Sequence, residues 1–177
     1  MTQAKFCFGL VLCLIVATFA RAVDLREAYV GKSSCAQGLQ KGAESFGIRL
    51  DKKQVARLEA RTSEGRKILM IVQYQKEWDD CGTVRDIIQS KAADAFFVFE
   101  CVDGRDPGAV VVGTWRDQNV SGPSLQSWRV ELGELKFVPI VGPVRYVPQR
   151  LSGNDDGSDL AGWARQRGAK TRQRSTK

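Results

Sequence analysis

The sequence predicts an α+β fold: two N-terminal helices, then a mainly antiparallel sheet of about four to five strands with one inserted short helix. Apolar residues near the N-terminus recur at helical spacing, which indicates helices. From residue 67 onward, short runs rich in β-branched residues are separated by turn residues, which indicates strands. Short strands joined by turns pair antiparallel, because parallel neighbours need a crossover of about a dozen residues or more.

Residues 1–22 have the layout of a secretory signal peptide. Lys5 makes the start cationic, an uncharged apolar run extends from Phe6 to Phe19, and Ala-Arg-Ala at 20–22 is a small-x-small cleavage site. The run is shorter than the roughly 20 apolar residues that span a bilayer. We therefore expect an exported protein, periplasmic or extracellular, that begins at Val23 and has no transmembrane span after cleavage.

The predicted domains are a single globular α+β domain over residues 23–149 and a disordered basic tail over residues 150–177. The whole chain has a net charge of +7, and seven basic and three acidic residues lie from Arg150 onward. With Lys5 and Arg21 in the signal peptide, the globular domain is left close to neutral. The basic isoelectric point is therefore no evidence for a basic face on the domain.

Both N-terminal helices are predicted from capping signals. Asp24 can cap the first helix, with Glu27 reaching back to the free N–H groups. Asp51 and Gln54 can do the same for the second. The apolar face of the first helix comprises Leu25, Ala28, Tyr29, Ala36 and Leu39.

The strands are predicted from apolar runs that are too short for helices. Between two of these runs, residues 82–91 carry Val84, Ile87 and Ile88 at helical spacing and predict the inserted helix. Residues 127–140 alternate between apolar and polar, with Gly133 marking a bulge or turn. The remaining strands are expected at Lys67–Tyr74, Phe96–Val102, Ala109–Trp115 and, as a short edge strand, residues 144–148.

Three cysteines remain after removal of the signal peptide: Cys35, Cys81 and Cys101. An odd number allows one disulfide and one thiol, or a bridge to a second chain. A helix over 82–91 would cover roughly 15 Å and a strand over 96–102 roughly 20 Å in the opposite sense, which brings Cys81 close to Cys101. We therefore predict a Cys81–Cys101 disulfide, worth about 3 kcal/mol. Pairing of Cys35 with either partner remains an alternative, and an unpaired Cys35 would be buried or bridged to another chain.

The composition excludes several kinds of catalytic site. The chain has no histidine, which removes Ser-His-Asp and Cys-His arrangements and histidine-bearing zinc sites. No Cys-x-x-Cys motif is present. Asp79 and Asp80 precede Cys81 and oppose formation of a reactive thiolate. We therefore expect no catalytic, metal or cofactor site.

The leading functional expectation is a small non-enzymatic protein that binds, inhibits or assists another envelope or secreted protein. One alternative is a hydrolase that uses acidic residues. The candidates are Glu77, Asp79, Asp80, Glu100, Asp103 and Asp106. A second alternative is a protein tethered to a polyanion by its tail, through weak contacts that salt disrupts. The candidate contact residues are Arg165, Arg167, Lys170, Arg172, Arg174 and Lys177.

Overall fold

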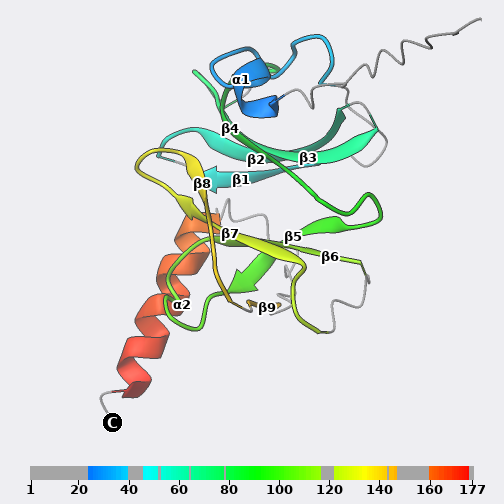
Figure 1. The fold of residues 1–177 in the computed structure, drawn as a ribbon. Helices are drawn as coiled ribbons and strands as arrows, with labels where there is room; N and C mark the ends of the chain where they lie inside the picture. The colour runs from blue at the N-terminus through cyan, green and yellow to red at the C-terminus, as the bar shows by residue number, and fades with distance from the viewer. Residues whose placement is uncertain are drawn as a thin grey trace, which may run out of the picture.

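The computed structural model describes residues 24–39, 46–51, 53–63, 65–77, 79–116, 122–142, 144–146 and 160–175. The predicted signal peptide lies outside these residues. The described chain forms two antiparallel β-sheets, with a short helix near its start and a longer helix at its end (Figure 1). Within this part of the chain, no helix is both long and apolar enough to cross a membrane.

Each sheet is built from strands that follow one another along the chain. The first sheet has the order β1-β2-β3-β4, and the second has the order β8-β7-β6-β5-β9. The first sheet contains β1 (Phe46–Asp51), β2 (Ala56–Ser63), β3 (Arg66–Gln73) and β4 (Thr83–Gln89). The second contains β5 (Phe96–Val102), β6 (Val111–Trp115), β7 (Gln126–Glu131), β8 (Lys136–Pro139) and β9 (Arg145–Tyr146). The helices are α1 (Leu25–Tyr29) and α2 (Leu160–Ser175).

The two sheets pack face to face around a shared apolar core, as in a β-sandwich. Leu58 and Ile71 contribute from the first sheet, and Val112 and Trp128 from the second. The outer face of the first sheet is also apolar, and residues 24–39 cover it. The first sheet is therefore buried on both faces, which explains why β3 reads as a continuous apolar run.

The predicted α+β class, with two N-terminal helices followed by one sheet, is wrong, because the described chain is mostly β and forms two sheets. Of the first predicted helix, only the segment α1 is helical. Asp24 caps it as expected, with its carboxylate accepting a hydrogen bond from the Arg26 backbone N–H at 2.9 Å. Gly31 then adopts a φ of +82°, which favours glycine, and the chain leaves the helical path there.

The second predicted helix, from Asp51, is a β-hairpin turn. The polar residues that could cap a helix satisfy the turn instead. Asp51 accepts a hydrogen bond from the Lys53 N–H at 2.9 Å, and Gln54 donates to the Leu132 carbonyl at 2.7 Å. Aspartate bonds its own backbone in this way at both turns and helix starts, so the capping signal does not separate the two.

The predicted inserted helix over 82–91 is strand β4. The ladder between β3 and β4 slips where Ile71 faces Asp86 and Val72 faces Val84. A bulge at Arg85 therefore shifts the alternation by one residue. Val84 and Ile87, three residues apart, consequently lie on the same side of the sheet, and this spacing imitates a helix.

The strand predictions from residue 67 onward are confirmed. Strands β3, β5 and β6 occupy the three apolar runs, and β7 and β8 flank a turn that contains Gly133. The predicted edge strand is β9, of which Arg145 and Tyr146 pair with β5. All ladders between the described strands are antiparallel, as predicted.

Asp86 joins the two sheets where β4 and β8 meet. Its side chain is buried and accepts a hydrogen bond from the Phe137 N–H at 2.7 Å. Arg26 of α1 forms an ion pair with the same carboxylate at 3.1 Å. Because a buried carboxylate needs such partners, this contact fixes α1 and β8 to the same edge of the first sheet.

The predicted disorder of the C-terminal tail is wrong for residues 160–175, which form helix α2. Composition alone did not reveal this helix, because it buries only a few small apolar side chains. Ala161 and Ala164 enter the shared core, and Leu160 and Trp163 pack against it. The other predicted tail residues, 150–159 and 176–177, lie outside the described residues.

Candidate functional site

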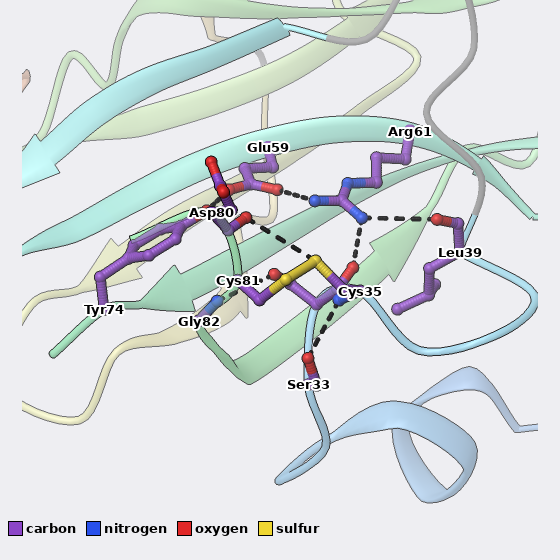
Figure 2. The surroundings of a disulfide bond; sticks show 10 residues. Ser33, Cys35, Leu39, Glu59, Arg61, Tyr74, Asp80, Cys81 and Gly82 are labelled. Carbon is purple, nitrogen blue, oxygen red and sulfur yellow. Dashed lines mark hydrogen bonds and ion pairs between the residues drawn. A yellow bond between two sulfur atoms is a disulfide. The ribbon is translucent and has the colours of Figure 1, made fainter. Parts of the chain in front are cut away.

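An N-terminal cover, residues 24–39, is fastened to the outer face of the first sheet by a disulfide between Cys35 and Cys81 (Figure 2). The two Cα atoms are 5.5 Å apart. Cys35 belongs to the cover and Cys81 to the loop before β4, and both residues are exposed. The predicted Cys81–Cys101 disulfide is therefore wrong, and Cys35 is neither buried nor bridged to another chain.

The Cys81–Cys101 prediction is wrong because it depends on the predicted helix over residues 82–91, which is strand β4. With residues 83–89 in a strand of the first sheet and Cys101 in β5 of the second, Cys81 and Cys101 belong to different layers. Cys101 is fully buried, and its thiol donates a hydrogen bond to the Val98 carbonyl at 3.3 Å. The presence of a disulfide is compatible with an exported location, since disulfides persist in oxidising compartments.

Backbone pairing also holds the cover. The Gly31 N–H donates to the Val84 carbonyl at 2.8 Å, and the Ser34 N–H donates to the Gly82 carbonyl at 2.8 Å. A Cβ on Gly82 would lie 2.6 Å from the Gln73 carbonyl oxygen. Glycine therefore lets the loop before β4 lie close to the end of β3. The cover therefore extends the first sheet beyond the edge strand β4.

A buried polar cluster of Glu59, Arg61 and Tyr74 lies beneath the cover (Figure 2). These residues are 7%, 5% and 5% exposed, respectively. Arg61 forms an ion pair with Glu59 at 2.5 Å, and the Tyr74 hydroxyl donates to the other Glu59 oxygen. Burying this charge is tolerable only because it is paired and hydrogen-bonded.

The cover itself completes the polar cluster. Arg61 donates to the backbone carbonyls of Ser34 and, at 3.4 Å, Leu39, which both belong to the cover. Figure 2 shows the Arg61 guanidinium beside the disulfide and directed at the Leu39 carbonyl. Sequence reasoning missed this cluster. The alternation in β2 places Arg57, Glu59 and Arg61 on one face, but only the fold shows what covers that face.

Helix α2 carries five of the six predicted polyanion contacts, all but Lys177. Arg165 is exposed, whereas Arg167 is half-buried against the sandwich. The side chains of Lys170, Arg172 and Arg174 and the whole of Lys177 lie outside the described part. The structure therefore identifies Arg167 as an anchoring cation of α2.

Arg167 holds α2 to the turn between β5 and β6. Its guanidinium donates to the carbonyls of Pro107, Cys101 at 3.3 Å and Ala109 at 2.7 Å. It also lies over the Trp163 ring, 4.0 Å from the centroid. Desolvation by burial lowers the pKa of Arg167, although an arginine stays charged under ordinary conditions.

Replacing Arg167 with alanine is expected to loosen α2 and to lower the free energy of unfolding by about 2 kcal/mol or more, since hydrogen bonds from charged groups are worth about 1.5–3 kcal/mol. Urea denaturation and amide hydrogen exchange of α2 would measure both effects. Arg66→Ala, at the exposed start of β3, is the control, with an expected change within about 0.5 kcal/mol. Unchanged exchange in α2 of the Arg167 variant would show that this arginine is no anchor.

The acidic residues considered for hydrolysis do not form one group. Asp79 and Asp80 lie in the loop before β4 of the first sheet, whereas Asp103 and Asp106 cap the turn after β5 of the second. Asp103 accepts from the Arg105 N–H at 2.9 Å, and Asp106 accepts from the Gly108 N–H at 3.2 Å. Among the described residues, no group of three or more Asp, Glu or Cys side chains could hold a metal ion.

Glu77 lines a small pocket at the β1–β2 hairpin, together with Asp51, Arg49 and Arg57. Glu77 forms an ion pair with Arg49, and Arg57 donates to the Glu77 carbonyl. Asp51 is engaged by the hairpin turn. Both carboxylates of this pocket therefore serve as acceptors within the fold, and the Glu100 side chain lies outside the described residues.

No protein-family model, curated protein or solved structure matches this chain.

Proposed function

We propose that this chain is an exported, non-enzymatic binding protein, periplasmic or secreted, that holds an anionic polymer through helix α2. The observation that carries the proposal is a basic helix attached to a folded sandwich. Residues 160–175 include five basic residues and no acidic residue. Figure 1 shows the C-terminal half of α2 extending past the second sheet, away from the fold.

A docked helix supports binding better than a disordered tail would. Its backbone is already ordered, so the partner does not have to offset that ordering entropy. Four of the five basic residues are arginines, whose planar guanidinium matches carboxylate and phosphate groups with paired hydrogen bonds. Binding releases counterions from the polymer, so the affinity falls as salt rises.

Two contacts favour a flexible anionic polysaccharide over nucleic acid or a membrane. Arg167 already occupies one face of the Trp163 ring, so this indole is poorly placed to stack on a base. Leu160, Ala161, Trp163 and Ala164 of α2 pack on the sandwich, so the side chains described in this helix offer little apolar surface to insert among lipids. The basic charge of α2 is therefore the feature by which it would recognise an anionic polymer.

The test measures binding of fluorescent heparin, a sulfated polysaccharide, between about 50 and about 200 mM salt. The charge variant carries Arg165→Gln, Lys170→Gln, Arg172→Gln and Arg174→Gln. We expect it to lose about tenfold or more in affinity at low salt and to show a shallower salt dependence. Arg167 is left unchanged so that α2 stays docked.

The matched control removes the same charge from exposed positions elsewhere: Lys53→Gln, Arg66→Gln, Arg85→Gln and Lys91→Gln. It should bind heparin nearly as the parent does. Equal losses in the two variants would reduce the effect to net charge and would refute a site on α2. Tighter binding to single-stranded DNA or to anionic vesicles than to heparin would refute the choice of partner.

A further inference from the structure

The N-terminal cover contributes nothing to the core between the two sheets. Every residue of that shared core comes from position 48 or later in the chain. The apolar residues of the cover, Leu25, Tyr29, Ala36 and Leu39, pack only on the outer face of the first sheet. The sandwich therefore has a complete core of its own, and the cover is an outer layer.

The covalent attachment of this layer lies at the surface. Cys35 and Cys81 are both exposed, so a small thiol can approach the disulfide. At the other end of the cover, α1 is held by the ion pair between Arg26 and Asp86. The part from residue 31 to residue 39 relies on the disulfide, a few backbone hydrogen bonds, the hydrogen bonds from Arg61 and the burial of Ser34 and Leu39.

The polar cluster beneath the cover reduces the resistance to opening. Two acceptors of Arg61 are carbonyls of the cover, and water can replace them when the cover leaves. The pair with Glu59 lies within β2 and persists without the cover. Opening consequently hydrates a charged cluster, whereas most buried layers would expose only apolar surface.

We propose that the Cys35–Cys81 disulfide is a redox-sensitive clasp that closes the N-terminal cover over the Glu59–Arg61–Tyr74 cluster. A thiolate reductant attacks one sulfur, forms a mixed disulfide and releases the other cysteine as a thiolate, which takes a proton. A second thiol of the reductant then displaces the first cysteine. The protein gains two thiols, and the reductant leaves as its disulfide.

Reduction opens the cover from residue 31 to residue 39 while the sandwich stays folded. The opened face presents a guanidinium, a carboxylate and a phenol beside the apolar side chains of Met70 and Val72. In the oxidised protein this face is closed. The proposal is independent of binding through α2, because α2 lies against β1 and the second sheet rather than the cover.

The test is hydrogen exchange followed by mass spectrometry on the full mature chain, with and without a thiol reductant. Peptides covering residues 31–39 and 82–84 should exchange roughly tenfold faster or more after reduction, because their amides pair with each other. Peptides from β6 and β7 should keep their rates. A Cys35→Ser/Cys81→Ser variant should show the fast pattern without reductant and no further change with it.

Two results would overturn the proposal. Equal exchange of the cover in both redox states would show that the disulfide does not control opening. A rise of similar size in every peptide would show that reduction unfolds the whole protein. The hydrogen exchange of the cover does not depend on whether the α2 charge variant loses heparin binding. Each of the two proposals can therefore fail without the other.

Discussion

Replacing Arg61 with methionine is expected to lower the free energy of unfolding by about 3–5 kcal/mol, because it leaves a buried carboxylate without its cation. Glu59 is 7% exposed, and its remaining partner in the cluster is the Tyr74 hydroxyl. The two carbonyls of the cover also lose their donor. Urea denaturation followed by tryptophan fluorescence measures the change.

The double variant Glu59→Leu/Arg61→Met should be less destabilised than the sum of its two single variants, since it buries no unpaired charge. The control is the exposed ion pair between Arg116 and Asp94, whose side chains are 65% and 68% exposed. Arg116→Gln should cost less than about 1 kcal/mol. A loss of similar size for Arg61→Met would mean that the cluster is hydrated in solution and is not a buried network.

The second large effect is expected for Cys35→Ser/Cys81→Ser. The disulfide joins residues 46 positions apart. In the chain-entropy model, a loop of this size contributes about 4 kcal/mol, and local opening of the cover before unfolding reduces that figure. At about 2–4 °C per kcal/mol for a protein of this length, the midpoint of thermal unfolding should fall by about 10 °C.

Scanning calorimetry of the oxidised parent and the double variant measures this shift. Adding reductant to the variant should have no further effect, which excludes other targets of the reductant. Non-reducing peptide mapping should find Cys35 joined to Cys81. Recovery of a Cys81–Cys101 peptide, or an unchanged midpoint, would contradict the assignment of this disulfide as the structural bridge.

The sequence predicts the second sheet well because its signals are local. The run at Phe96–Val102 contains aromatic and β-branched residues bounded by turns, and the strand has those limits. Alternation and Gly133 likewise identify β7, β8 and their turn. Such strands depend mainly on residue type and on the turns beside them, so one sequence is sufficient.

The first sheet is predicted incorrectly because two local sequence patterns, a capping signal and an apolar spacing, are each compatible with both a helix and a strand or turn. Asp51 with Gln54 satisfies a turn as well as a helix start. A bulge at Arg85 gives Val84 and Ile87 the spacing of a helix. The disulfide prediction is wrong for the same reason, because the proximity of Cys81 to Cys101 depends on a helix over residues 82–91 that does not form.

The candidate site was predicted only in part, because its main contacts are non-local. The basic residues near the C-terminus are visible in the composition, but the anchoring role of Arg167 depends on carbonyls of β5 and of the turn after it, about 60 positions away. The polar cluster under the cover depends on residues 34 and 39 meeting β2. Neither arrangement leaves a periodic pattern in the sequence.

The pairing of Cys35 with Cys81 has a consequence for biogenesis. These are consecutive among the cysteines that follow the predicted signal peptide, and Cys101 comes after them. A chain that is exported amino terminus first delivers Cys35 and then Cys81 to the oxidising side before Cys101 arrives. The native bridge is thus the one that forms by joining cysteines in order of arrival, and burial of Cys101 in β5 then protects it from exchange. Such a protein can mature with an oxidase alone, without a disulfide isomerase.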